Sequence, residues 1–152
     1  MQERFHKIDA RVISHLRRLE VPMARTAIFI VYFWFGALKL IGASPAGPLV
    51  LALFDKTIGF MPFTLFYTLF AIYEMTIGIL FLITGLERVA IFFLCLHLVT
   101  TAMPLLLLSD ITWQGLLVPT LEGQYIIKNI LIAALAVVIG ARVAPKSSTF
   151  TS

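Results

Sequence analysis

Four ionisable side chains interrupt the long apolar stretches of this 152-residue chain: Lys39, Glu74, His97 and Lys128. A charged side chain near the centre of a bilayer costs about 2.5–3.5 kcal/mol on insertion scales, so it normally faces protein or a water-filled cavity. A buried glutamate and a buried histidine can also carry protons. Glu74 must be protonated, paired with a cation or in contact with water at that depth. We therefore treat these four residues as candidate ligand-binding residues.

Their depths predict that they meet. At about 1.5 Å of rise per residue, Glu74 and His97 lie roughly 16 and 18 Å below the outer ends of their apolar segments. Lys39 and Lys128 lie about 6 and 7 Å below theirs by the same rise. Each of the four segments contributes one member, which favours a shared polar site. Two simpler interpretations remain open: the lysines snorkel to the outer interface, and His97 is a neutral core residue bonded to a neighbouring helix.

The chemistry of such a cluster favours a small oxygen-bearing ligand. Tyr125 and Asn129 flank Lys128, and together these residues could hold an anion or a carbonyl oxygen. A quinone head group needs hydrogen-bond donors near its carbonyls and an apolar sleeve. Aromatic residues on the first two apolar segments could form that sleeve: Tyr32, Phe35, Tyr67, Phe70 and Tyr73. The predicted ligand-binding residues are Lys39, Glu74, His97, Lys128, Asn129 and Tyr125, and the predicted ligand is a quinone, with no covalently bound cofactor.

Several other kinds of site are not expected. One histidine inside the apolar segments cannot make a bis-histidine haem site, and a metal site needs more ligands than Glu74 and His97. The single Cys95 excludes an internal disulfide and a cysteine-ligated metal within one chain. The sequence contains no recognisable cofactor or catalytic motif, so no catalytic residue is assigned, and whether the isolated chain is an enzyme stays open.

The elements that must position these residues follow from composition. Apolar residues make up 60% of the chain and charged residues 13%, whereas soluble domains average about 45–50% and 25%. Four continuous apolar windows, at 24–43, 63–84, 89–109 and 123–141, are each long enough to cross about 30 Å of hydrocarbon as a helix. The sequence therefore predicts an all-α integral membrane protein, a four-transmembrane-helix bundle.

The flanking segments predict the domain organisation. Residues 1–23 form a basic amphipathic helix, suited to lying along an anionic inner leaflet and ended by Pro22. Residues 24–144 form the transmembrane domain, and 145–152 a cytoplasmic tail. In the first outer connection, Ser44 and Pro45 are expected to start a short helix over 49–54. We expect the third connection, about 110–122, to be a loop.

Positive charge predicts the orientation. Nine Lys and Arg residues outside the predicted spans or at their inner ends (Arg25) fall on the side of the two termini, and only Lys56 falls on the other. This bias places both termini in the cytoplasm. The same bias accounts for the cluster of basic residues before Thr26, so nucleic acid is not an expected partner.

The motif residues resemble those of the DoxX-like family of small four-helix membrane proteins. The resemblance covers about residues 26–143 and includes Trp34-Phe35-Gly36-Ala37-Leu38-Lys39, Glu74 followed by Gly78 and Gly85, and Glu122-Gly123-Gln124-Tyr125 leading to Lys128-Asn129. It implies a four-helix bundle in the bacterial inner (plasma) membrane and an association with redox or oxidative-stress systems. Relatives include subunits linked to thiosulfate:quinone oxidoreduction and to thiol-stress complexes. By position, Lys39, Glu74 and Lys128 match the family, whereas His97 is proposed from depth alone.

These observations predict a small membrane protein that binds a quinone or similar ligand as an accessory subunit of a redox or oxidative-stress system. Its partners would be the lipid bilayer and other membrane or cytoplasmic subunits. Two alternatives stay open. One is a structural or assembly subunit of a larger membrane complex, and the other is a proton-coupled small-molecule carrier.

Overall fold

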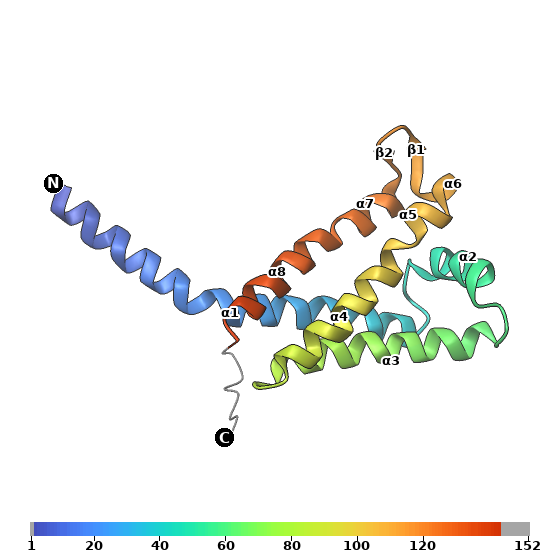
Figure 1. Cartoon of the computed structure of the whole chain (residues 1–152), viewed down its shortest axis with the longest axis horizontal. Coiled ribbons are helices and arrows are strands. Elements are labelled where there is room, and N and C mark those ends of the chain that lie inside the picture. Colours follow the sequence, from blue (N-terminus) through green and yellow to red (C-terminus); the bar gives the residue numbers. More distant parts are fainter. Residues whose placement is uncertain (1, 144–152) are drawn as a thin grey trace, which may run out of the picture.

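A computed structural model describes residues 2–143, with side chains for residue 6 and residues 8–143. The predicted tail at 145–152 lies outside the described residues. The chain forms helices joined by short connections and one small hairpin (Figure 1). The helices are α1 (Gln2–Leu40), α2 (Gly47–Thr57), α3 (Phe63–Leu82), α4 (Glu87–Ala102), α5 (Pro104–Leu107), α6 (Ser109–Thr112), α7 (Leu121–Ile127) and α8 (Asn129–Ala141); the strands are β1 (Trp113–Gly115) and β2 (Val118–Pro119).

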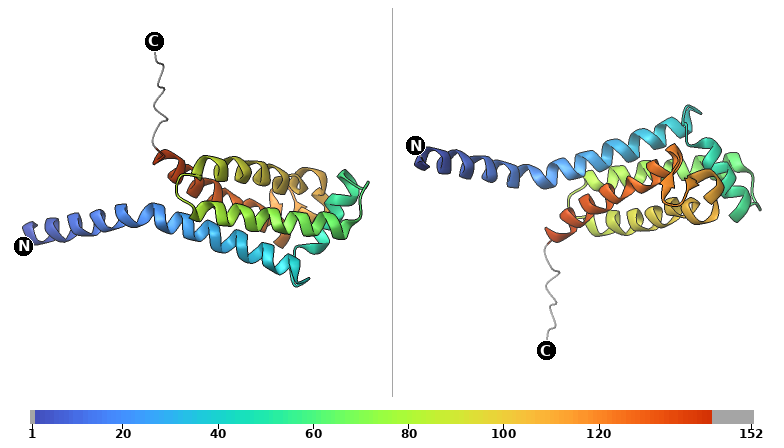
Figure 2. Two further views of the ribbon diagram at one scale, coloured as in Figure 1. Left: turned by 90° about the horizontal axis from the view of Figure 1, so that it is seen from below. Right: turned by 90° about the horizontal axis from the view of Figure 1, so that it is seen from above.

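Four helical segments of the described chain are long and apolar enough to cross a membrane: Ile8–Leu40, Phe63–Leu82, Glu87–Leu107 and Leu121–Ala141. The protein is therefore an all-α four-helix membrane protein, as its sequence predicts. Helices α1 and α3 lie side by side, and α4 and α8 complete the bundle (Figure 2). The core between them is apolar and includes Ile28, Ile77, Phe81, Leu94 and Ile139.

Two glycines bring α1 and α3 into close contact. A Cβ atom on Gly36 would lie 2.7 Å from the Ala71 carbonyl oxygen, and one on Gly78 would lie 3.1 Å from the Phe33 backbone nitrogen. Small residues permit this kind of approach between membrane helices. The contact at Gly36 lies one turn before Lys39, so it fixes the height of that lysine against α3.

The predicted break at Pro22 is wrong. Helix α1 runs for 39 residues without interruption and contains Pro22 in its interior. A proline inside a helix removes one backbone hydrogen bond and can kink the helix without ending it. The ribbon of α1 changes direction about halfway along (Figure 1). Residues 2–23 therefore belong to the same continuous helix as the first span.

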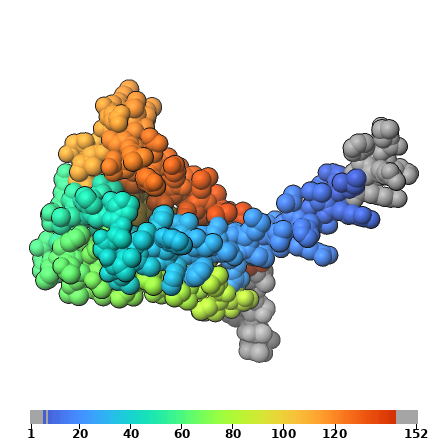
Figure 3. All heavy atoms as spheres, turned by 180° about the vertical axis from the view of Figure 1, so that it is seen from behind, coloured from blue at the N-terminus to red at the C-terminus, as the bar shows by residue number. Residues whose placement is uncertain are grey.

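The N-terminal half of α1 extends beyond the ends of the other helices (Figure 3). At the point where it leaves the bundle, Glu20 forms an ion pair with Arg142, the residue that follows α8. Beyond this pair, the side chains of residue 6 and of residues 8–19 are exposed, including Ile8, Val12 and Leu16.

Helix α2 covers one end of the bundle, as the apolar character of the first connection requires. Its Phe54 is buried against two rings of α3, with centroids 5.5 Å from Phe63 and 4.9 Å from Phe66. Lys56 Nζ also donates a hydrogen bond to the Leu107 carbonyl oxygen over 2.6 Å. These contacts hold α2 against both α3 and α5.

The start of α2 differs from the prediction. The helix runs over Gly47–Thr57, and its N-cap residue is Ala46, with Pro48 in the first turn. Ser44 lies outside the helix, where its Oγ accepts a hydrogen bond from the Ala46 backbone nitrogen over 3.3 Å. The N-cap role expected for Ser44 is therefore wrong by two residues, because its side chain closes the preceding turn.

The third connection contains a hairpin that the sequence did not predict. Strands β1 and β2 pair antiparallel, with Trp113 opposite Pro119. Trp113 Nε1 donates to the Leu105 carbonyl oxygen over 2.9 Å, which ties the hairpin to α5. Thr120 then caps α7, where its Oγ1 accepts from the Gly123 nitrogen over 3.1 Å. Strands of two and three residues are too short for an alternating pattern to reveal them.

Candidate functional site

The centre of the site is an ion pair between the first two spans. Lys39 Nζ donates to Glu74 Oε2 over 2.6 Å. Both residues are buried, with 7% and 6% of their surfaces exposed. Buried lysine and glutamate are rare unless they pair with each other. The pair forms because Gly36 lets α1 approach α3 at Ala71, one turn from Glu74 on the same helix face.

Two further side chains extend this pair into a chain of hydrogen bonds. His97 Nε2 lies 3.1 Å from Glu74 Oε1, and His97 Nδ1 lies 3.0 Å from Tyr32 Oη. An ionised carboxylate only accepts hydrogen bonds. When Glu74 is ionised, His97 Nε2 therefore donates a hydrogen bond to it. A neutral His97 then accepts a hydrogen bond from the Tyr32 hydroxyl at Nδ1. We call the residues Lys39, Glu74, His97 and Tyr32 the polar cluster.

Aromatic rings surround His97. Phe70 stacks on it with ring centroids 5.3 Å apart and planes 12° apart, and Tyr73 lies at 6.0 Å. Lys39 Nζ lies 5.6 Å from the centroid of the Phe70 ring. Phe70 is only half-buried, so its ring packs between the cluster and the surface of the bundle.

The arrangement of the polar cluster is suited to proton exchange and to binding of an oxygen-bearing group. Its members form one connected series of groups that can hold or pass a proton, in surroundings of low polarity. A lysine ammonium has three donors, and the Lys39–Glu74 hydrogen bond uses one of them. A donor of this kind is suited to a carbonyl oxygen.

The structure brings three of the four predicted ionisable residues together and leaves Lys128 outside. Lys128 is exposed at the junction between α7 and α8, and its Nζ lies 5.1 Å from the centroid of the exposed Tyr125 ring. The expectation that Lys128 meets Glu74 is wrong. The predicted depth is similar for both lysines, but Lys128 lies on the exposed surface of the fourth span.

Asn129 reaches α4 close to the polar cluster without joining it. Its Nδ2 lies 3.5 Å from Thr101 Oγ1, and Thr101 Oγ1 donates to the His97 carbonyl oxygen over 2.9 Å. Asn129 therefore contacts the helix turn that follows His97 and does not contact the imidazole.

The sequence predicts Tyr32 only as part of the aromatic sleeve, whereas in the structure its hydroxyl belongs to the polar cluster. The spacing could have indicated this, because Tyr32 precedes Lys39 by seven residues and both therefore lie on one face of α1. The predicted sleeve residues Phe70 and Tyr73 do lie against His97, whereas Phe35 is exposed.

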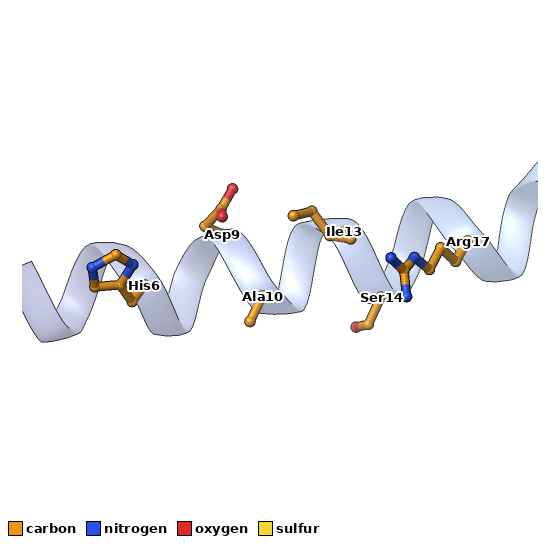
Figure 4. Close-up of a pocket in the computed structure, with 6 residues that line it drawn as sticks. All are labelled: His6, Asp9, Ala10, Ile13, Ser14 and Arg17. Atoms are coloured by element: carbon orange, nitrogen blue, oxygen red, sulfur yellow. The ribbon is translucent and has the colours of Figure 1, made fainter.

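Other polar features lie apart from the polar cluster. A shallow hollow on the N-terminal half of α1 is lined by residues of that one helix: His6, Asp9, Ala10, Ile13, Ser14 and Arg17 (Figure 4). Among the residues whose side chains the structure describes, no three His, Cys, Asp or Glu residues gather as metal ligands.

Comparison with known proteins gives this chain no family: no family model, no curated protein and no solved structure matches it.

Proposed function

We propose that this protein binds a quinone or similar ligand beside the polar cluster, as an accessory subunit of a membrane redox or oxidative-stress system. The observation that carries the proposal is the buried Lys39–Glu74 ion pair, which His97 and Tyr32 extend by hydrogen bonds. A purely structural ion pair has no need of such a series of groups that can exchange protons.

The residues present fit such a ligand. Lys39 would donate a hydrogen bond to a carbonyl oxygen, and the Phe70 ring offers an apolar surface for a flat head group. His97 and Glu74 would hold or pass the proton that accompanies reduction of a carbonyl. The quinone itself, when bound, supplies the electron-accepting chemistry, and the redox cofactors would belong to partner subunits.

The cellular setting is also part of the proposal. The resemblance to DoxX-like proteins and the excess of Lys and Arg on the side of the termini support a bacterial inner membrane with both termini in the cytoplasm. Labelling of cysteines introduced at Gln114, in the hairpin, and at Ser14, in α1, tests the orientation. A reagent that cannot cross the membrane should label intact cells at position 114 and not at position 14.

Ligand binding is tested with the purified full chain in lipid nanodiscs and a short-tailed ubiquinone analogue. Glu74→Gln removes the charge that holds Lys39 and His97 in place, so we expect affinity to fall about ten- to a hundredfold, the worth of a hydrogen bond to a charged group. Glu122→Gln, an exposed carboxylate on α7, is the matched control and should bind like the wild type. Equal affinity of wild type and Glu74→Gln would reject the proposal.

One observation favours a second candidate function. The members of the polar cluster hydrogen-bond one another, so the cluster is satisfied without a ligand. Such a cluster suits a subunit whose role is assembly of a larger membrane complex. Purification of the Glu74→Gln variant from native membranes separates the two roles. Loss of ligand binding with partners retained supports the first, and loss of partners from a chain that still binds the analogue supports the second.

A further inference from the structure

Two buried side-chain polar atoms have no hydrogen-bond partner among the described residues: Arg25 Nη2 and the hydroxyl oxygen of Tyr67 on α3. The Arg25 guanidinium still donates through its other two nitrogens, whereas the Tyr67 hydroxyl makes no hydrogen bond within the described part of the chain. A buried hydroxyl without a partner is costly, and such groups are rare in folded proteins. By contrast, the hydroxyl of Tyr73 on the same helix donates to the Phe93 carbonyl oxygen over 2.7 Å. The unpaired hydroxyl therefore needs an explanation specific to Tyr67.

Tyr67 lies on the same face of α3 as Glu74. Seven residues, or two helical turns, separate them, which corresponds to a rise of about 10 Å. Ala71 lies between them on this face, and neighbouring Phe70 stacks on His97. Tyr67 and Glu74, the member of the polar cluster on α3, thus lie on one side of that helix, and Phe70 lies between them along the helix axis.

The surroundings of Tyr67 hold its ring in place and leave its hydroxyl in a narrow space. Its ring stacks on Phe63, with centroids 5.1 Å and planes 28° apart. At the start of α2, a Cβ atom on Gly47 would lie 3.6 Å from the Tyr67 oxygen. The beginning of α2 therefore lies over the hydroxyl, and no side chain of residue 47 occupies the space between them.

We propose that Tyr67 is the second polar contact of the ligand that binds at the polar cluster, an inference that rests on the proposed function. A tyrosine hydroxyl donates to a carbonyl oxygen and accepts from a hydroxyl, so it suits both a quinone and its quinol. Two polar contacts at different heights on α3 select a planar head group with oxygen atoms at both ends. A ring with a single carbonyl would use only one of them.

The first experiment needs no ligand. Thermal unfolding of the full chain in detergent compares Tyr67→Phe with Tyr73→Phe. Removal of an unpaired hydroxyl relieves its desolvation, so the midpoint for Tyr67→Phe should equal or exceed that of the wild type. Tyr73→Phe, which loses an existing hydrogen bond, should unfold at a lower temperature. A clear drop for Tyr67→Phe would show that its hydroxyl has a structural partner and would overturn the inference.

The second experiment measures binding in nanodiscs of two probes, a short-tailed benzoquinone and a cyclohexadienone that has one carbonyl. We expect Tyr67→Phe to bind the benzoquinone about three- to tenfold more weakly, the worth of one neutral hydrogen bond. It should bind the cyclohexadienone like the wild type. Glu74→Gln should weaken the binding of both probes.

The outcomes separate this inference from the proposed function. Normal benzoquinone binding by Tyr67→Phe, together with weak binding by Glu74→Gln, would overturn the role of Tyr67 and leave the proposed function standing. A wild-type protein that binds neither probe would reject the proposed function and the inference with it.

Discussion

A partly buried ion pair, Arg25–Glu87, and the buried Lys39–Glu74 pair both join α1 to the rest of the bundle, and their surroundings differ. Arg25 Nη1 lies 3.0 Å from Glu87 Oε1, and Arg25 Nε donates to the Phe81 carbonyl oxygen over 2.6 Å. Glu87 Oε2 accepts from the Gly85 nitrogen over 2.9 Å. Each member of this pair is thus bonded to the backbone around the turn between α3 and α4. In the Lys39–Glu74 pair, the next partner is the side chain of His97.

This difference separates a structural role from a chemical one. The hydrogen bonds that extend the Arg25–Glu87 pair lead to backbone groups and not to a further titratable side chain, so we expect this pair to fix the positions of three helices. The Lys39–Glu74 pair continues into an imidazole and a phenol, which can gain or lose protons. The comparison predicts that variants of the first pair change stability alone, whereas variants of the second change stability and ligand binding.

The largest expected effect follows loss of the Glu74 carboxylate. Glu74→Ala leaves the buried Lys39 ammonium without its partner, which should lower the free energy of unfolding by about 3–5 kcal/mol. Unfolding by a denaturing detergent measures this change. The double variant Lys39→Met/Glu74→Ala is the control and should recover part of the loss, because it leaves no unpaired charge. Full stability of Glu74→Ala alone would contradict the buried ion pair.

Gly36→Ala tests the helix contact that sets the height of Lys39. The added methyl group would collide with the Ala71 carbonyl oxygen and with Met75, whose Cγ lies 2.6 Å from the Cβ position. We expect a loss of about 1–3 kcal/mol, typical of overpacking, together with weaker quinone binding. Gly115→Ala, in the open hairpin, should change neither quantity. An unchanged Gly36→Ala variant would argue against close contact at this position.

Arg25→Met sharpens the comparison from the structural side. Glu87 keeps its hydrogen bond from Gly85, so the cost should be about 1–2 kcal/mol, less than for Glu74→Ala. Ligand affinity, measured on the same preparation, should stay at the wild-type value. A selective loss of binding in Arg25→Met would remove the distinction between the two pairs.

The smallest effect is expected for the exposed lysine. Lys128→Met should change stability by less than about 0.5 kcal/mol, as for most surface substitutions. The same substitution at the buried lysine, Lys39→Met, should weaken quinone binding about tenfold or more. Parallel titrations of the two variants check this contrast, and equal losses would return Lys128 to the ligand site.

The sequence predicted the parts of the fold that depend on hydropathy. The spans and the depth of Glu74 and His97 follow from apolar length and helical rise, and in the structure Glu74 bonds to both Lys39 and His97. Rotation of a helix about its axis is harder to predict, because the fourth span is apolar on nearly all sides. For this reason Lys128, at a suitable depth, was predicted to lie in the cluster but lies on the outer surface of the bundle.

Local rules failed where tertiary contacts decide the outcome. Pro22 suggested a break, yet α1 continues through it beside the Glu20–Arg142 pair. The unpaired hydroxyl of Tyr67 was also beyond prediction from sequence, because it depends on how α2 folds back over α3. Contacts between distant segments determine both features.

Photoaffinity labelling with an azido-quinone in native-like lipid, followed by mass spectrometry of the labelled peptides, tests the ligand site most directly. A quinone bound at the polar cluster should label α1 and α3 near Lys39 and Phe70, and these labels should be displaced by unlabelled quinone and lost in Glu74→Gln. Labels spread over the lipid-facing surfaces, equal in wild type and Glu74→Gln, would contradict a ligand site at the polar cluster.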